Sequence, residues 1–558
     1  MKKFLLYFHT IKYLKLKQIF FRLYYFFYKP SVSIDIQKIN LNKTKSVSPC
    51  HFILKEKIYF KNNDAEFLNH AADISNKNIW NDKTLEKLWL YNLHYFDALN
   101  AADLDQKKIA YQLLKRCVDE NPPFLGIGWE AFPISLRIVN IIKYALSGNN
   151  LSEKIIHFLY LQARFLNKKC EHHLLGNHLF ENYKSLCIAG LFFDTDESQK
   201  WFQKGFQGLK KEIKEQILND GGHFELSTMY HNIILEDLLD LNIIFKFYKK
   251  EFIWSGEVEK MLQWLNAMKR SNHEISYFND AANDIAATPE KIFSQALNLD
   301  YKILPEENGI KHFSDSGYIV VKNSRFKLIA DVGNIGSDYL PGHGHADVLS
   351  FELMIDDIPV FVNLGTSCYG NSDRRLFERG TSAHNTVVIN EKNSSEIWSG
   401  FRVGKRARIK NINVDEKNNS YFIKASHDGY SRFQKNLYHE RAWEISENKI
   451  TISDYINRSV DNAYIYFHLH PDCKITFDSE RKIRIMLKNY DEIQFEIDNK
   501  CTIVENFYVS TFGFLYGTRS LKININHLTH KRQIATLLFS NKLCQINEKL
   551  TLLAGNVT

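Results

Sequence analysis

The sequence predicts an all-α domain followed by an antiparallel β-sandwich, and three observations lead to this fold class. The chain has 558 residues, 44% of them hydrophobic, which is enough for two sizeable cores. Its apolar residues recur with a helical period from about residue 60 to 305, and with a period of two after about residue 312. Helices segregated from a long run of strands favour separate α and β layers over a parallel α/β sheet.

The first element, residues 1–58, is predicted to be a basic, aromatic N-terminal arm. Residues 1–30 hold seven Lys or Arg and no acidic residue, and basic side chains interrupt their apolar stretches. This pattern fits neither a membrane-spanning helix nor a cleavable signal peptide. Two alternatives stay open: an amphipathic segment at a membrane surface, or a helix docked on its own protein through its aromatic face.

Two domains are predicted to follow, residues 59–308 and residues 309–558. In the first, apolar stripes from Ile156 to Leu166 and from Ile234 to Tyr248 have the three-and-four spacing of helices. In the second, alternating patterns such as Phe326 to Asp331 predict strands. The eight cysteines are scattered singly, which predicts free, mostly buried thiols.

Two polar segments of the helical half are candidates for chemistry. On one helix through residues 171–182, His173 and Asn177 would share a face and line a cleft, unless the segment is a polar network between helices. In residues 220–231, two glycines lead into an apolar stripe and place Tyr230 near a helix N-terminus. The dipole there favours phenolate and proton transfer, although a packing role for the tyrosine is the alternative.

The most specific local signal lies in residues 341–347. His343 and His345 are two apart in extended chain, so both imidazoles face one site. Two such groups can be paired metal ligands, or one ligand beside a catalytic group. Residues 362–386 add Tyr369, His384 and three arginines, whose guanidinium groups suit carboxylate or sulfate unless they belong to a solvated loop.

Taken in this order, the segments resemble the heparinase II/III family of polysaccharide lyases. The resemblance spans about residues 85 to 470 and rests on Gly176-Asn177-His178, residues 220–231, residues 342–347 and residues 383–386. It implies an incomplete (α/α) toroid as the helical domain. It also implies β-elimination of a uronate-containing, glycosaminoglycan-like polysaccharide.

The resemblance further implies roles for single residues. Asn177, helped by His178, would neutralise the uronate carboxylate and the enolate-like charge that develops from it. Tyr230 would be the acid/base phenol, His343 its partner across the cleft, and Tyr369 a second phenol. The implied substrate-binding residues are Arg137, His173, Arg375 and Arg379.

The resemblance also raises the question of whether this chain binds a structural zinc ion, the one cofactor that it suggests. In several members of the family it is held by the second His of the His-x-His pair, a downstream Asp and a later His. His345 and His384 fit this pattern, but Asn363 stands where the Asp is expected. A neutral carboxamide is a poor zinc ligand, so a hydrogen-bonded network of His345 with Asn363 is the alternative.

Two other functions stay open, a uronate C5-epimerase on the same scaffold and a non-catalytic glycan-binding protein of surface-polysaccharide assembly. Of the net charge of +8, seven positive charges belong to residues 1–30, which leaves +1 for the remainder and no bulk support for a polyanionic substrate. We expect an acidic polysaccharide as partner, membrane contact through residues 1–30, and no nucleic acid. We expect a bacterial protein in the cytoplasm or at the cytoplasmic membrane surface, with the periplasm as the alternative.

Overall fold

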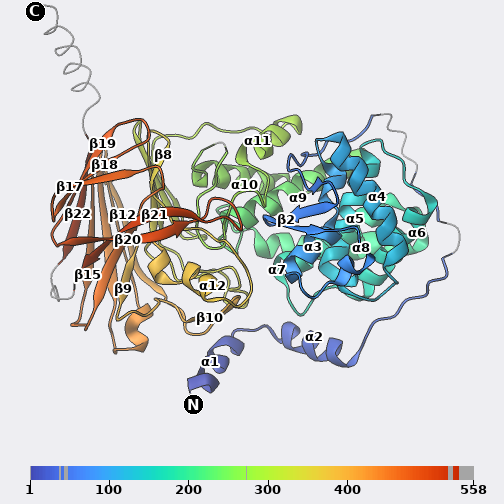
Figure 1. Ribbon diagram of the computed structural model, residues 1–558, viewed down its shortest axis with the longest axis horizontal. Coiled ribbons are helices and arrows are strands. Elements are labelled where there is room, and N and C mark those ends of the chain that lie inside the picture. Colours follow the sequence, from blue (N-terminus) through green and yellow to red (C-terminus); the bar gives the residue numbers. More distant parts are fainter. Residues whose placement is uncertain (1, 37–38, 43–47, 272, 526–531, 540–558) are drawn as a thin grey trace, which may run out of the picture.

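The computed structural model describes residues 2–36, 39–42, 48–271, 273–525 and 532–539. A helical domain is followed by a domain of antiparallel sheets, and the two lie side by side (Figure 1). The change of period in the sequence therefore marks a real change of architecture.

The helical domain contains α3 to α11. Their bounds are α3 (Lys87–Tyr95), α4 (Leu104–Glu120), α5 (Ala131–Leu146), α6 (Glu153–Lys168), α7 (Gly176–Phe192), α8 (Asp196–Gln216), α9 (Thr228–Phe247), α10 (Ser255–Met268) and α11 (Pro289–Asn298). A small sheet of β1 (Phe60–Lys61), β2 (Asp64–Phe67) and β3 (His70–Asp73) precedes them. The two predicted stripes lie on α6 and α9 and face the core, where Leu159, Ile234 and Leu238 are all 0% exposed.

Helix α7 begins later than the polar pattern suggested. Leu175 has φ +68° and Gly176 has φ +58°, so the chain passes through the left-handed region just before the helix. A Cβ at Gly176 would also collide with Leu340. His173 consequently lies in the preceding turn and shares no helix face with Asn177, which sits in the first turn of α7.

Among the described residues, the β domain contains three large antiparallel sheets and a two-stranded one made of β10 (Ile397–Ser399) and β11 (Arg402–Val403). The first has the order β4 (Gly309–Phe313), β5 (Tyr318–Lys322), β6 (Phe326–Asp331), β7 (Phe351–Ile355) and β8 (Ile358–Phe361). The second has the order β12 (Ile409–Lys417), β13 (Ser420–His427), β14 (His439–Ser446), β15 (Lys449–Ile456), β22 (Gln533–Phe539), β19 (Glu492–Ile497), β18 (Lys482–Met486) and β17 (Lys474–Ser479). The third has the order β20 (Cys501–Tyr508), β21 (Tyr516–Asn524), β16 (Ala463–His468) and β9 (Val387–Ile389).

The centre of the β4–β8 sheet, strands β5 to β7, is buried on both faces, although the alternation in β6 would allow one face to meet water. All six residues of β6 are buried. Leu328 packs into the core of the β domain, whereas Ile329 joins Trp264 and Met268 of α10 in a separate cluster. Apolar contact across this junction therefore holds the two domains together.

The N-terminal arm forms two helices, α1 (Lys2–Ile11) and α2 (Leu16–Phe27), that dock on the protein along one edge of the molecule (Figure 1). Gln18 is buried and donates to the carbonyl of Leu174 at 3.2 Å, and the Tyr25 hydroxyl donates to the carbonyl of Cys170 at 2.8 Å. Among the described residues, no helix combines the length and apolar character that crossing a bilayer requires.

The cysteines in the described ranges are free, and all of them except the half-buried Cys368 are buried. Cys544 lies outside these ranges. Their burial agrees with the prediction of free, mostly buried thiols.

Candidate active site

Residues from both domains meet at the junction, at the N-terminal ends of two helices. Asn177 and Tyr230 come from the first turns of α7 and α9. His343 comes from the loop between β6 and β7, and Tyr369 from the loop after β8. The Tyr230 and Tyr369 hydroxyls are 3.0 Å apart, and the ring centroids of Tyr230 and His343 are 3.9 Å apart. The fold thus gathers two phenols and an imidazole that are far apart in sequence.

Glu225 connects Asn177 to this cluster, and the sequence reasoning missed it as a functional residue. The Asn177 Nδ2 lies 3.2 and 3.1 Å from the two carboxylate oxygens of Glu225. The Oε2 of Glu225 is 3.9 Å from His343 Nε2. Glu225 is only 3% exposed, so its carboxylate faces these partners and not bulk water.

Asp280 is the buried centre of the site, and it too was missed. Its Oδ2 is 2.8 Å from His343 Nδ1, its Oδ1 is 2.8 Å from His345 Nε2, and both oxygens accept from Arg375. Burial acts to raise the pKa of Asp280, but Arg375 and the two imidazole hydrogen bonds hold it well below its usual range. Because an ionised carboxylate only accepts, Nδ1 of His343 must carry a proton, which leaves Nε2 as the basic nitrogen of the neutral ring.

The protonation of the two phenols differs from the sequence expectation of a phenolate. Burial raises the pKa of Tyr230 well above 10, and nearby Tyr369 and Asp280 raise it further. The pKa of Tyr369 is raised for the same main reason. The dipole at the start of α9 does not overcome this desolvation, so at neutral pH both groups are phenols that can donate a proton.

His178 lies beside the cluster, whereas His173 lies under the arm. The His178 ring is 4.2 Å from that of Phe132, and its Nδ1 is 3.3 Å from a Glu171 carboxylate oxygen. Burial acts to lower the pKa of His178, but Glu171 outweighs it and the net shift is upward. His173 instead packs against Tyr25 of α2, with ring centroids 5.6 Å apart.

The three arginines that were expected to bind substrate carboxylates have interior partners instead. Arg137 donates to Gln162 and to two carbonyls of the helical domain, and it is 1% exposed. Arg379 donates to the carbonyls of residues 341, 344 and 399, and Arg375 holds Asp280. Because Arg375 and Arg379 are 0% exposed, these side chains position the site and do not present a charge to solvent.

The candidate zinc ligands lie together but do not form a zinc-binding set. His345 Nδ1 is 3.3 Å from His384 Nε2, and the opposite nitrogen of His384, Nδ1, is 3.0 Å from Asn363 Oδ1. The carboxamide oxygen therefore lies on the wrong side of the His384 ring to share an ion with His345. Within the described residues, no three His, Cys, Asp or Glu side chains are placed to hold a metal. The structure shows a hydrogen-bonded network from Asn363 through His384 and His345 to Asp280, so His345 reaches Asn363 through His384 and not directly, as the alternative had it.

Comparisons with known proteins cover most of the chain. Residues 76–312 match the family profile described as "Heparinase II/III N-terminus", and residues 305–534 match "Heparinase II/III-like, C-terminal". A heparin-sulfate lyase of Bacteroides stercoris is 28% identical over 249 residues, which is 40% of this chain and 37% of the relative. A heparin-sulfate lyase of Bacteroides thetaiotaomicron is 27% identical over 338 residues, which is 50% of this chain and 48% of the relative. The matched regions thus span less than half of these relatives.

Solved structures share the fold. A crystal structure of heparinase III has a TM-score of 0.64 at 18% identity and covers 86% of this chain and 80% of that one. A heparan sulfate lyase from Pedobacter heparinus has a TM-score of 0.56 at 16% identity, covering 85% and 80%. These likenesses confirm the predicted incomplete (α/α) toroid followed by an antiparallel β-sandwich.

Proposed function

The chain belongs to the heparinase II/III family, and we propose that it is a polysaccharide lyase that cleaves a uronate-containing, glycosaminoglycan-like glycan by β-elimination. The observation that carries the proposal is the contact of Tyr230 with His343 and Tyr369 at the domain junction. The heparin-sulfate lyase relatives support the same class of substrate, an acidic polysaccharide.

The reaction needs a base for the proton next to the uronate carboxylate and an acid for the leaving glycosidic oxygen. Nε2 of His343, left free to accept because Nδ1 is bonded to Asp280, takes that proton. The electron pair left behind forms the carbon–carbon double bond as the glycosidic C–O bond breaks. The protonated phenol of Tyr230 then gives its proton to the leaving oxygen, and the opposite configuration at the uronate carbon exchanges the two roles.

Residues at the start of α7 bind the carboxylate of the substrate uronate. Asn177 has two amide N–H donors, so it can donate to a substrate carboxylate while it keeps Glu225. Glu171 raises the pKa of His178 next to it, which favours the positively charged form of that ring. Donors held in place before the substrate arrives stabilise the enolate-like charge without reorganising during the reaction.

The test is the release of unsaturated, ultraviolet-absorbing uronate products from a panel of polyuronates and glycosaminoglycans. General acid–base catalysis contributes roughly 100-fold or more, so Tyr230→Phe and His343→Ala should each lower kcat by at least that factor with folding preserved. Tyr144→Phe is the matched control, because this half-buried tyrosine stacks on Tyr111 away from the site.

Full activity in folded Tyr230→Phe would refute the assigned role. Exchange of solvent deuterium into the uronate without chain cleavage would instead identify an epimerase. Binding of the glycan with neither cleavage nor exchange would identify a glycan-binding protein.

A further inference from the structure

Helix α2 carries apolar side chains on two opposite sides, and only one side is covered by the protein. The docked side holds Gln18, Phe21 and Tyr25, and the Phe21 ring lies 4.5 Å from that of His172. The other side is open to solvent. Its large apolar residues, with their exposed fractions, are Leu16 (84%), Phe20 (60%), Leu23 (58%) and Phe27 (81%).

The outward residues of α2 form one continuous stripe, because they are spaced four, three and four apart. At ~100° per residue this stripe lies about 180° from the docked stripe, so docking cannot cover both. Helix α1 repeats the arrangement. Thr10 accepts from Trp398 at 3.1 Å on its docked side, whereas Phe4, Phe8 and Ile11 are exposed by 74%, 53% and 48%.

The arm that carries this apolar surface is positively charged. Residues 1–30 hold seven Lys or Arg and no acidic residue. Lys15 pairs with Glu215 of α8, but Lys12 and Lys17 have no ion pair in the described structure and are exposed next to the outward stripes. A water-exposed apolar stripe edged by basic side chains has the character of a helix that lies in the interface of an anionic bilayer.

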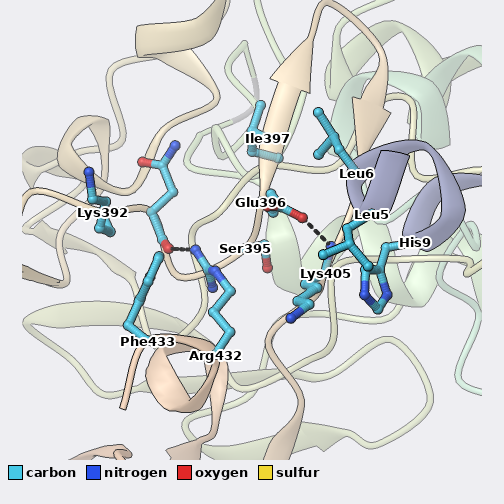
Figure 2. Close-up of a pocket in the computed structure, with 11 residues that line it drawn as sticks. Leu5, Leu6, His9, Lys392, Ser395, Glu396, Ile397, Lys405, Arg432 and Phe433 are labelled. Carbon is cyan, nitrogen blue, oxygen red and sulfur yellow. Dashed lines mark hydrogen bonds between the residues drawn. The ribbon is translucent and has the colours of Figure 1, made fainter. Parts of the chain in front are cut away.

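A pocket of about 470 Å³ beneath α1 continues the positive charge toward the β domain (Figure 2). Leu5, Leu6 and His9 of α1 face Lys392, Lys405 and Arg432 across it, with Glu396 as the acidic residue of the lining. Burial lowers the pKa of His9, and the charges of Lys12 and Lys405 lower it further. The pocket is thus both apolar and cationic, and it suits an anionic head group next to the exposed stripe of α1.

We propose that α1 and α2 bind the surface of an anionic lipid bilayer through the stripe formed by Phe4, Phe8, Ile11, Leu16, Phe20, Leu23 and Phe27. Docking of the opposite faces on both domains keeps the two helices flat against the body, so the arm anchors the protein without crossing the membrane. A second copy of the chain suits the stripe less well, because pairing two arms would bring together two segments with seven positive charges each.

The test is co-sedimentation of the full chain with vesicles of phosphatidylcholine alone or mixed with phosphatidylglycerol. We expect binding to the anionic vesicles that weakens as salt is added. The double variant Phe20→Ser/Phe27→Ser should lower the apparent affinity at least about tenfold, because it removes two large apolar side chains from the contact. Phe477→Ser/Tyr490→Ser is the matched control, since these side chains are 42% and 82% exposed on the β domain. The melting temperature and lyase rate of both variants should equal those of the wild type.

Three results would overturn the proposal. The first is no binding of the wild type to anionic vesicles. The second is equal binding by the stripe variant. The third is a wild-type dimer, measured by light scattering, that the stripe variant converts to a monomer without any vesicle binding.

Discussion

Replacing Asp280 with Asn tests whether the buried carboxylate sets the basicity of His343. The carboxylate accepts from His343, His345 and Arg375 at once, and every one of these bonds is made inside the protein. An amide in its place has a single accepting oxygen, and its NH2 group can only donate. At least one of the three partners must then lose its acceptor.

The expected effects on rate and on stability can be separated. A hydrogen bond to a charged group is worth about 1.5–3 kcal/mol, which corresponds to roughly a ten- to hundredfold lower kcat if His343 loses it in the transition state. Arg375 is 0% exposed, and leaving its charge without a carboxylate costs about 3–5 kcal/mol of folding free energy. The variant should therefore be both slower and less stable.

The control is Asp454→Asn, because Asp454 has the same kinds of partner in the β-sandwich. It accepts from His439 at 2.7 Å and from Arg441 at 2.8 Å, and Arg441 is likewise 0% exposed. Both variants should lose a similar amount of stability in urea unfolding. Initial rates of unsaturated product release, divided by the folded fraction, should fall only in Asp280→Asn.

The pH profile gives a second readout. Without the carboxylate, His343 loses the acceptor that holds its Nδ1 proton, so the pH dependence of kcat/KM should differ between Asp280→Asn and the wild type. Equal rates per folded molecule in the two variants, with unchanged pH profiles, would refute the positioning role of Asp280.

Two further predictions concern stability and metal. Asp347 is 2% exposed, and burial raises its pKa to about 6, so the folded state favours the protonated carboxyl group. The free energy of unfolding should therefore decrease as the pH rises from about 4 through 6. Asp347→Asn should raise the melting temperature at pH 8 but barely at pH 4. An equal shift at both pH values in calorimetry would contradict this. Because Asn363 hydrogen-bonds His384 on the side away from His345, we also expect EDTA to leave the melting temperature unchanged. If EDTA lowered the melting temperature and atomic absorption detected zinc in the purified protein, the zinc-ligand set would be complete after all.

The sequence predicts the site residues that lie in local motifs and misses those whose role depends on long-range contacts. His343 stands between two glycines, Tyr230 lies in the segment that follows the Gly221-Gly222 turn, and these short patterns identify them. Asp280 is 63 residues from His343 and 95 from Arg375, and no local spacing marks a side chain that becomes central only after folding. Glu225 lies within a polar segment that the sequence does single out, yet its bond to Asn177 joins the loop before α9 to the first turn of α7.

The mistaken expectations share the same physical cause. Periodicity indicates which residues lie on one face, but not what finally covers that face. The phenolate predicted at Tyr230 is disfavoured by burial, which a helix N-terminus alone does not reveal. Similarly, the helix predicted through His173 begins only at Gly176, because Leu175 before it adopts a left-handed backbone. The fold class was easier to predict, because a change of apolar period over hundreds of residues averages out such local exceptions.

The doubly buried centre of the β4–β8 sheet makes the two halves of the molecule depend on each other for solubility. Its outer face supplies Ile329 and Met354 to a cluster that Trp264 of α10 completes. A fragment that carried either half alone would expose these apolar side chains to water, so each half should aggregate when it is made without the other.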